Sequence, residues 1–277
     1  MEPLGGRVWL NGRVLAAREA RVPLLDGGLQ HGEALFETVR VYGGVAFRLD
    51  AHLDRLAMGA RALGLAAPSS ATLQAAVPAY LAACGATDAR LRIVWSAGPP
   101  GGPPTLALVA TTLDLPAGPA VCVLAEPRWS LQDVSAVKLC GRVEYRLARD
   151  RAVAAGADEA LLTAPDGRVL EGTRANVFLV RGGGLVTPPV DGSILDGVTR
   201  GVVLEIARAR GIAVAEQPVR ADGLRAATEV FLTGSVQEIR PVREVRGHFT
   251  AATTPGPVTA RLQAAYAEVV ARETTLR

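Results

Sequence analysis

The chain has 277 residues, and 49% of them are hydrophobic, which is enough for a large core in one or two domains. Its net charge is only +3, and no basic stripe is interleaved with aromatic residues, so nucleic-acid binding is not expected. The three histidines, His31, His52 and His248, lie far apart without a metal-ligand spacing, so no metal site is expected.

Two features of the sequence indicate a cytoplasmic protein. No apolar run is long enough to cross a bilayer, and the N-terminus lacks a signal-peptide pattern. The cysteines, Cys84, Cys122 and Cys140, are widely spaced and form no CxxC pair, which is typical of a reducing compartment. We therefore expect no membrane segment and no disulfide framework.

Residues 1–115 are predicted to form an N-terminal α+β domain. The Asn11-Gly12 pair between two apolar runs is a strong signal for a two-residue hairpin turn. Asp50 can cap a helix that carries an apolar stripe and ends at Gly64. The other predicted elements are hairpins over residues 7–15 and 37–48, a helix over residues 72–84, and strands over residues 89–96 and 105–113.

Residues 116–120 are the predicted linker to a second α+β domain, because this stretch is rich in proline and glycine. The C-terminal domain is expected to cover residues 121–277 and to carry Lys138. Strands and helices are mixed without strict βαβ alternation, which favours two α+β domains over a doubly wound sheet or a barrel. The predicted helices cover residues 142–155, 200–210 and 258–272, and the predicted strands cover residues 159–163, 168–170, 176–180, 185–187, 213–216 and 229–233.

The most informative residue is Lys138, which is the only lysine among 30 basic residues. Arginine can replace lysine on a surface, but its guanidinium stays protonated and cannot act as a nucleophilic amine. A single lysine therefore indicates amine chemistry, such as a Schiff base with a carbonyl substrate or with pyridoxal phosphate. The alternative is compositional bias, since a chain rich in Ala, Gly, Arg and Val can lose lysine without selection.

A pyridoxal phosphate site would also need backbone donors and a cation for the phosphate. A glycine turn at Gly197, Val198 and Thr199 enters a predicted helix, where the helix dipole favours an anion. Arg55, which lies off the apolar stripe of its helix, could supply the cation, and Ser235 could supply a hydroxyl. Each of these features also has an ordinary interpretation. The glycine turn could be a helix cap, Arg55 a solvated surface charge and Ser235 a turn serine.

The ring nitrogen of such a cofactor needs a carboxylate to stay protonated. Glu171 precedes a glycine-containing turn at a predicted strand end, which suits a site residue. On spacing alone, a turn carboxylate paired with a neighbouring arginine is the simpler interpretation. No single residue therefore distinguishes a cofactor site from the ordinary interpretations, and the surrounding sequence has to be considered.

Taken in order, the sequence blocks resemble the class IV aminotransferase family, the fold type IV pyridoxal-phosphate enzymes. The family includes branched-chain, D-amino-acid and (R)-amine aminotransferases and 4-amino-4-deoxychorismate lyase. The similar blocks are DGGLQHGEALFETVR (26–40), HLDRL (52–56), KLCGRVEYRLAR (138–149), GADEALL (156–162), EGTRANVF (171–178), TPP (187–189), GVTR (197–200), EVFLTGS (229–235) and PV (241–242). They extend over nearly the whole chain.

The resemblance implies a homodimeric aminotransferase that uses pyridoxal 5'-phosphate. Lys138 would hold the cofactor as a Schiff base and carry the proton during conversion to pyridoxamine phosphate. Glu171 would pair with the ring nitrogen, and Leu195 would pack against the ring. The phosphate would be bound by Arg55, Val198, Thr199 and Ser235, next to the turn at Gly197.

Some positions depart from the family pattern. Gly141 and Arg142 follow the lysine where the family often has an asparagine, and Arg174 replaces a small residue. Either arginine could receive a substrate carboxylate or be an exposed charge. The resemblance also assigns Phe36 to the substrate pocket, and Ala97 stands where D-amino-acid aminotransferases usually carry an arginine, which weakens that interpretation.

Two alternatives stay open at this point. The first is 4-amino-4-deoxychorismate lyase, which would release pyruvate and form 4-aminobenzoate with the same lysine and cofactor. The second is a non-catalytic protein that binds pyridoxal phosphate or sequesters carbonyl compounds. The amino donor, the acceptor, the stereochemistry of the substrate and any oligomer beyond a dimer are not specified by these motifs.

Overall fold

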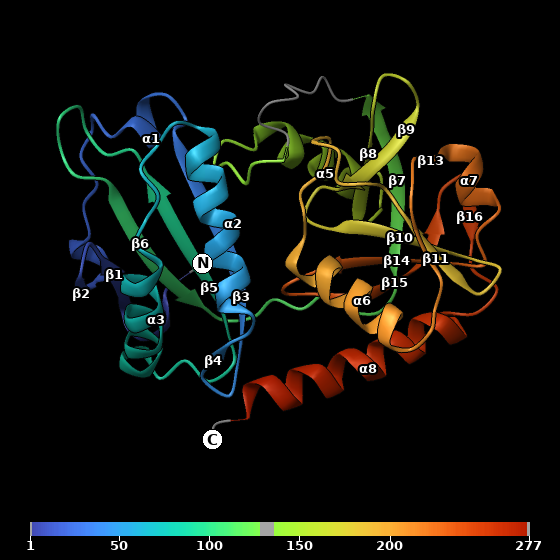
Figure 1. Ribbon diagram of the computed structural model, residues 1–277. Coiled ribbons are helices and arrows are strands. Elements are labelled where there is room, and N and C mark those ends of the chain that lie inside the picture. The colour runs from blue at the N-terminus through green and yellow to red at the C-terminus, as the bar shows by residue number, and fades with distance from the viewer. Residues whose placement is uncertain (1, 128–135, 276–277) are drawn as a thin grey trace. The chain divides into compact units, whose positions relative to one another are not determined.

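The computed structural model describes residues 2–127 and 136–275, and the chain divides into two compact units (Figure 1). Unit 1 comprises Met1–Leu115, Val137–Gly141 and Val270–Arg277, and unit 2 comprises Pro116–Ala136 and Arg142–Val269. Each unit combines a sheet with helices, as the sequence predicts.

Unit 1 is built on an antiparallel sheet with the strand order β2-β1-β6-β5-β3-β4 in the described part of the chain. Helices α2 and α3 cover one face of this sheet (Figure 1). The strands are β1 (Arg7–Leu10), β2 (Arg13–Ala16), β3 (Ala34–Tyr42), β4 (Val45–Ala46), β5 (Ala89–Ser96) and β6 (Thr105–Thr111). The helices are η1 (Leu4–Gly6), η2 (Ala17–Glu19), α1 (Gly27–Gln30), α2 (Leu49–Ala62) and α3 (Ser70–Cys84).

Local sequence signals explain where the elements of unit 1 begin and end. Asn11 and Gly12 have φ values of 45° and 90°, which the tight turn between β1 and β2 requires. The Ser69 hydroxyl accepts a hydrogen bond from the Thr72 N–H and caps α3. The prediction that Asp50 caps α2 was wrong: the cap position is held by Arg48, and Asp50 lies in the first turn.

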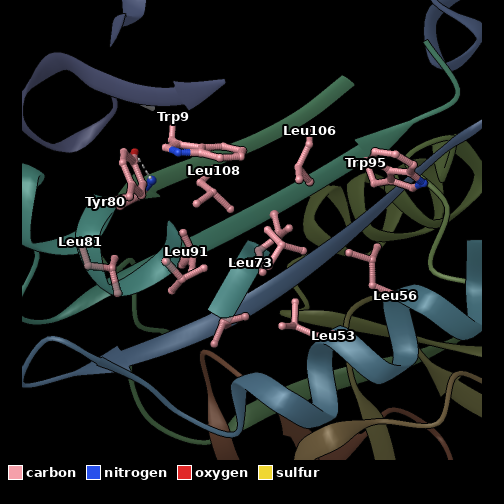
Figure 2. Packing of buried hydrophobic residues seen from close by; sticks show 14 of the residues in the cluster. Trp9, Leu53, Leu56, Leu73, Tyr80, Leu81, Leu91, Trp95, Leu106 and Leu108 are labelled. Atoms are coloured by element: carbon pink, nitrogen blue, oxygen red, sulfur yellow. Dashed lines mark hydrogen bonds between the residues drawn. The ribbon is translucent and has the colours of Figure 1, made fainter. Parts of the chain in front are cut away.

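The core of unit 1 lies between the sheet and helices α2 and α3. Alternate residues of β5, including Leu91 and Ile93, point into this core, whereas Arg90 and Arg92 lie on the other face. The buried Tyr80 hydroxyl donates to the Arg7 carbonyl and accepts from a backbone N–H. Figure 2 shows the cluster with labelled side chains of Trp9, Leu53, Leu56, Leu73, Tyr80, Leu81, Leu91, Trp95, Leu106 and Leu108.

A buried charge cluster joins β3 to α2. Glu37 of β3 is 0% exposed, and Arg55 donates to both of its oxygens over 2.8 and 2.6 Å. His52 Nδ1 lies 2.7 Å from Glu37 Oε2. Burial acts to raise the pKa of Glu37, but Arg55 and His52 outweigh it and hold that pKa well below its ordinary value. Burial lowers the pKa of His52 despite the nearby carboxylate.

The Lys138 segment belongs to unit 1, although the sequence-based division placed Lys138 in the C-terminal domain. The reason is backbone pairing with the start of β3. The Phe36 N–H donates to the Lys138 carbonyl over 3.0 Å, and the Cys140 N–H donates to the Ala34 carbonyl over 2.8 Å. These bonds attach residues 137–141 to the first unit in space, even though they lie beyond the predicted linker in the sequence.

Unit 2 contains a larger mixed sheet with the order β12-β11-β10-β14-β15-β7-β8-β9-β13 in the described residues, and β16 pairs with β15. Strand β7 is parallel to both of its neighbours, β15 and β8. The strands are β7 (Ala120–Pro127), β8 (Glu159–Thr163), β9 (Arg168–Gly172), β10 (Asn176–Arg181), β11 (Gly184–Thr187), β12 (Val214–Glu216), β13 (Val219–Arg220), β14 (Glu229–Gly234), β15 (Glu238–Val245) and β16 (Phe249–Thr250).

The sequence analysis missed two central strands, β7 and β15. The apolar run at the start of β7 does not alternate with polar residues, so the period-2 signal of a half-buried strand is absent. Strand β15 contains Pro241 and four charged residues, which is unusual for the middle of a sheet. Tertiary packing therefore overrides local preference in β15, whereas the apolar run of β7 suits a buried strand but does not announce one by alternation.

The helices of unit 2 are α5 (Val143–Ala154), α6 (Val198–Ala209), α7 (Ala221–Arg225) and most of α8 (Pro257–Thr274), whose last residues from Val270 belong to unit 1. The buried Glu229 of β14 accepts from the backbone N–H groups of Val258 and Thr259, and so closes the start of α8. Among the described helices, none combines the length and apolar character needed to cross a membrane. Within residues 2–127 and 136–275, no group of His, Cys, Asp and Glu side chains is arranged to hold a metal ion.

We predict that His52 makes folding stability depend on pH. Its pKa is lowered in the folded state, so below an unfolded value of about 6.5 only the unfolded chain takes up the proton. Stability should therefore fall as the pH is lowered from about 7 to about 5. The pKa of Glu37 is also lowered, but its contribution is lost only below about pH 4.3.

Melting temperatures measured across this range for the wild type and His52→Asn check the prediction. The asparagine amide can replace the Nδ1–H donor but does not titrate. We expect the wild type to lose about 2–4 °C more than the variant, and His31→Asn, at an exposed position, to behave as the wild type. Equal losses in wild type and His52→Asn would contradict the assignment.

Candidate active site

Lys138 lies half-buried beside the first residues of β3. Its Nζ atom is 4.6 Å from the centre of the Phe36 ring, and Arg92 Cζ of β5 is 3.9 Å from the same ring centre. An aromatic ring attracts cations to its face, so Phe36 holds two cationic side chains together. Phe36, which the sequence analysis predicts to line the substrate pocket, is thus in contact with the only lysine of the chain.

Arg92 was missed by the sequence analysis. A signal was present, because the strand sequence ARLRIVWS alternates arginine with buried apolar residues and so places Arg90 and Arg92 on one face of β5. Arg92 Nη2 also lies 3.9 Å from the Cys140 sulfur, two residues beyond Lys138. Burial raises the pKa of the Cys140 thiol, against the effect of Arg92.

Arg55 is not the solvated surface charge that one sequence interpretation described, and its predicted contact with a ligand stays a prediction. Its side chain is 10% exposed and makes the two-pronged ion pair with Glu37. Such a pair fixes the plane of the guanidinium. Arg55 is therefore a rigidly held cation, and the residues that hold it are Glu37 and, through Glu37, His52.

Glu171 is a buried residue of β9, with 3% of its surface exposed. The Tyr145 hydroxyl lies 3.1 Å from one carboxylate oxygen, and the Leu195 N–H donates to the other over 3.1 Å. A phenol and a backbone amide thus hold the two oxygens in place. This environment differs from that of the exposed turn carboxylate considered in the sequence analysis, and Tyr145 was not identified there.

The segment between Leu195 and Thr199 forms the start of α6. Gly197 is the N-cap residue, and no side chain closes the helix at this position. A Cβ atom on Gly197 would lie only 2.0 Å from Asn176 Oδ1, so the close approach requires glycine. Asn176 in turn donates to the Leu195 carbonyl over 2.8 Å. The interpretation of this turn as an ordinary helix cap is therefore not what the structure shows.

An uncapped helix start is a favourable place for an anion. The first N–H groups of a helix have no intrahelical partner, and the helix dipole adds positive potential there. Val198 and Thr199 occupy the first two positions of α6, and Thr199 is buried. The predicted turn at Gly197 thus leads into a helix start without a side-chain cap, and its binding of phosphate stays a prediction.

The remaining candidates lie at several places in the two units. Ser235 is half-buried in the turn between β14 and β15, where Gly234 packs close to the carbonyl of the exposed Arg174. Arg142 is half-buried, and its guanidinium carbon lies 4.1 Å from the centre of the Tyr145 ring. Ala97 is half-buried and donates its N–H to the Glu33 carbonyl over 3.1 Å.

The donor set in these two units fits pyridoxal phosphate. Unit 1 contains Lys138, which carries the only side-chain primary amine, and Arg55, whose guanidinium is fixed by Glu37. Unit 2 offers a buried carboxylate, Glu171, and an uncapped helix start at Gly197. These groups match an aldehyde, a phosphate and a basic ring nitrogen in chemical type.

Comparison with known proteins gives a consistent result. The sequence model of the family described as amino-transferase class IV matches residues 34–245. The chain is 30% identical to a branched-chain-amino-acid aminotransferase of Pseudomonas aeruginosa, over 97% of this chain and 94% of the relative. It is 29% identical to a D-alanine aminotransferase of Bacillus licheniformis, over 97% and 98% of the two chains.

Solved structures of similar proteins have the same fold. A branched-chain aminotransferase from Thermoproteus uzoniensis with norvaline has a TM-score of 0.88 at 30% identity, covering 96% of this chain and 95% of that chain. The Escherichia coli branched-chain aminotransferase has a TM-score of 0.90 at 27% identity, covering 97% and 96%. These matches confirm the predicted fold class.

The family match covers more than half of the chain, and the relatives cover nearly all of it. The protein is therefore an enzyme with an aminotransferase fold and relatives named as aminotransferases. It follows from the motifs, the fold and these comparisons that the chain belongs to the class IV aminotransferase family.

Proposed function

We propose that this enzyme uses pyridoxal 5'-phosphate to move an amino group from an amino acid or amine to a 2-oxo acid or ketone. The observation that carries the proposal is Lys138, the only lysine of the chain, in a segment that the backbone hydrogen bonds of Lys138 and Cys140 hold against β3. Class IV aminotransferases depend on pyridoxal phosphate, and one of the similar solved structures is a branched-chain amino acid aminotransferase with pyridoxamine 5'-phosphate.

The protein side chains would divide the work in the following way. When bound, pyridoxal phosphate supplies an aldehyde that condenses with amines and a ring that withdraws electrons. The Lys138 amine binds the aldehyde and, once displaced by a donor, takes the proton from the substrate Cα atom. Glu171 keeps a proton on the ring nitrogen by accepting a hydrogen bond from it.

The other assigned residues bind and orient. Leu195 packs against the ring, and its N–H fixes one oxygen of Glu171. Arg55 is held by Glu37 and presents a fixed positive charge to the phosphate. The residues proposed to bind the phosphate are Arg55, Val198, Thr199 and Ser235, with Gly197 allowing the close backbone approach.

The substrate pocket and the oligomer are parts of the same proposal. Phe36, Ala97, Arg142 and Arg174 are proposed as pocket residues. We propose that the protein is a cytoplasmic homodimer. In unit 1, Leu24, Leu25 and Leu29 are exposed on one loop and the short helix α1. Exposed apolar patches of this kind mark protein interfaces and so support a dimer. Branched-chain amino acids and D-alanine are the first donors to test, since they appear in the names of the relatives.

The lyase alternative has weaker support. A structure named as a 4-amino-4-deoxychorismate lyase from Legionella pneumophila matches with a TM-score of 0.84 at 24% identity, which shows the common fold only. The curated relatives described above carry aminotransferase names. We therefore propose transamination rather than pyruvate elimination.

Borohydride reduction tests the role of Lys138. Reduction of the cofactor-loaded protein, followed by peptide mass spectrometry, is expected to find the pyridoxyl group on the peptide that contains Lys138, because no other side chain offers a primary amine. Lys138→Arg keeps the charge but removes the nucleophile and should remove the label. Labelling confined to the N-terminal amine would contradict the assignment.

Substitution of Glu171 tests the ring-nitrogen partner. Glu171→Gln is expected to retain the cofactor but to lower kcat about 100-fold, as for the loss of other preorganised polar groups in active sites. Saturating substrate concentrations and an absorption measurement of bound cofactor separate the two effects. Glu268→Gln, at an exposed helix position, is the matched control. Full kcat in Glu171→Gln would remove Glu171 from this role.

Substitution of Ser235 tests the phosphate site. Ser235→Ala should weaken the binding of pyridoxal phosphate about tenfold, because a hydrogen bond to a charged group is lost. Pyridoxal, which has no phosphate, serves as the control ligand and should bind both proteins alike. Dissociation constants measured by titration of the apoprotein decide the point. Equal loss of affinity for both ligands would argue against contact between Ser235 and the phosphate.

A further inference from the structure

We propose that Tyr145 is a positioning residue for Glu171: its hydroxyl holds the carboxylate oriented and ionised for its cationic partner. The inference rests on the role of Glu171 in the proposed function. It adds a residue of α5 to the apparatus that controls the ring nitrogen, seven positions after Lys138 in the sequence.

The carboxylate of Glu171 is held from two sides. The Tyr145 hydroxyl donates to Oε1, and the backbone N–H of Leu195 donates to Oε2, both over 3.1 Å. The donors come from different segments, the first turn of α5 and the loop before α6. Two donors on two oxygens fix the rotation of the carboxylate plane, which a single donor would leave adjustable.

Tyr145 is itself well fixed. It is 5% exposed in the first turn of α5, which begins at Val143. The Arg142 guanidinium carbon lies 4.1 Å from the centre of its ring, a cation–π contact made by the residue that precedes the helix. A positive charge close to a phenol also polarises its O–H bond. Arg142 thus supports Tyr145 as a donor to a negatively charged acceptor.

The chemistry of the pair explains why a hydroxyl matters at this position. A carboxylate can accept about four hydrogen bonds, and the donors from Tyr145 and Leu195 each take one. Hydrogen bonds to the charged form favour that form over the protonated acid. With Tyr145 in place, Glu171 stays a carboxylate. The proton then remains on the ring nitrogen, which donates a hydrogen bond to Glu171.

A purely structural role for Tyr145 predicts a different outcome. Loss of a buried hydroxyl that only supports the fold lowers stability but leaves the recognition of the ring nitrogen unchanged. Loss of a hydroxyl that acts through Glu171 changes this recognition specifically. Two cofactor forms separate the roles: pyridoxal phosphate and its 1-deaza analogue, in which a C–H group replaces the ring nitrogen.

The first measurement is the binding of both forms to the apoprotein of the wild type and Tyr145→Phe. We expect the wild type to prefer pyridoxal phosphate over the deaza analogue, and the variant to lose about three- to tenfold of this preference. Tyr80→Phe removes a buried hydroxyl of unit 1 that bonds to the Arg7 carbonyl and to a backbone N–H and contacts no residue of the proposed site in these bonds. It should lower the melting temperature and keep the preference.

The second measurement is a double-mutant cycle on the amino-donor half-reaction. In single-turnover experiments, Tyr145→Phe should slow the maximal rate about tenfold and leave the donor dissociation constant unchanged. In the Glu171→Gln background the same substitution should have little further effect, because the carboxylate through which it acts is gone. Additive effects, or an unchanged preference in Tyr145→Phe, would overturn the inference.

Failure of the inference can be told apart from failure of the proposed function. If the wild type prefers pyridoxal phosphate and Glu171→Gln abolishes the preference while Tyr145→Phe does not, only the role of Tyr145 is wrong. If the wild type itself shows no preference for the ring nitrogen, the assignment of Glu171 fails and the inference fails with it.

Discussion

A carboxylate buried away from water needs opposite charge or hydrogen-bond donors, because an uncompensated charge in the interior costs several kcal/mol. The two units meet this requirement differently. Glu37 of β3 is paired with Arg55 and His52, and the cluster joins a strand to a helix. Glu171 of β9 receives donors from a phenol and a backbone amide. The hydrogen bonds of the first arrangement come from the ionisable side chains Arg55 and His52, whereas those to Glu171 come from a phenol and a backbone amide.

This difference connects the fold to the proposed chemistry. The cluster on Glu37 fixes β3, and the adjacent residue, Phe36, binds the Lys138 carbonyl and contacts its ammonium. The only lysine of the chain therefore acquires its position from a strand anchored by buried charge. In unit 2, the loop that donates to Glu171 continues directly into the uncapped start of α6. One short segment thus fixes both the Glu171 carboxylate and the uncapped start of α6.

The sequence predicted the elements with strong local signals, such as the Asn11-Gly12 hairpin and the helix ending before Gly156. It missed β7 and β15, because a strand without alternation and a strand with an internal proline lack those signals. Lys138 and Glu171 were singled out by residue type and order. Tyr145 could not be, since its role depends on a hydrogen bond between α5 and β9 that no spacing reveals. The same holds for the burial of Arg55 against Glu37.

We propose that this chain carries out a transamination half-reaction on a cofactor held by Lys138. The most direct test is the absorption spectrum of the cofactor-loaded protein during titration with L-glutamate, L-leucine, D-alanine and (R)-1-phenylethylamine, each without a keto acceptor. Loss of the band of the lysine-bound cofactor and growth of a pyridoxamine phosphate band with at least one donor is the result expected. A protein that binds no pyridoxal phosphate, or a lysine-bound band that no donor changes, would contradict the account.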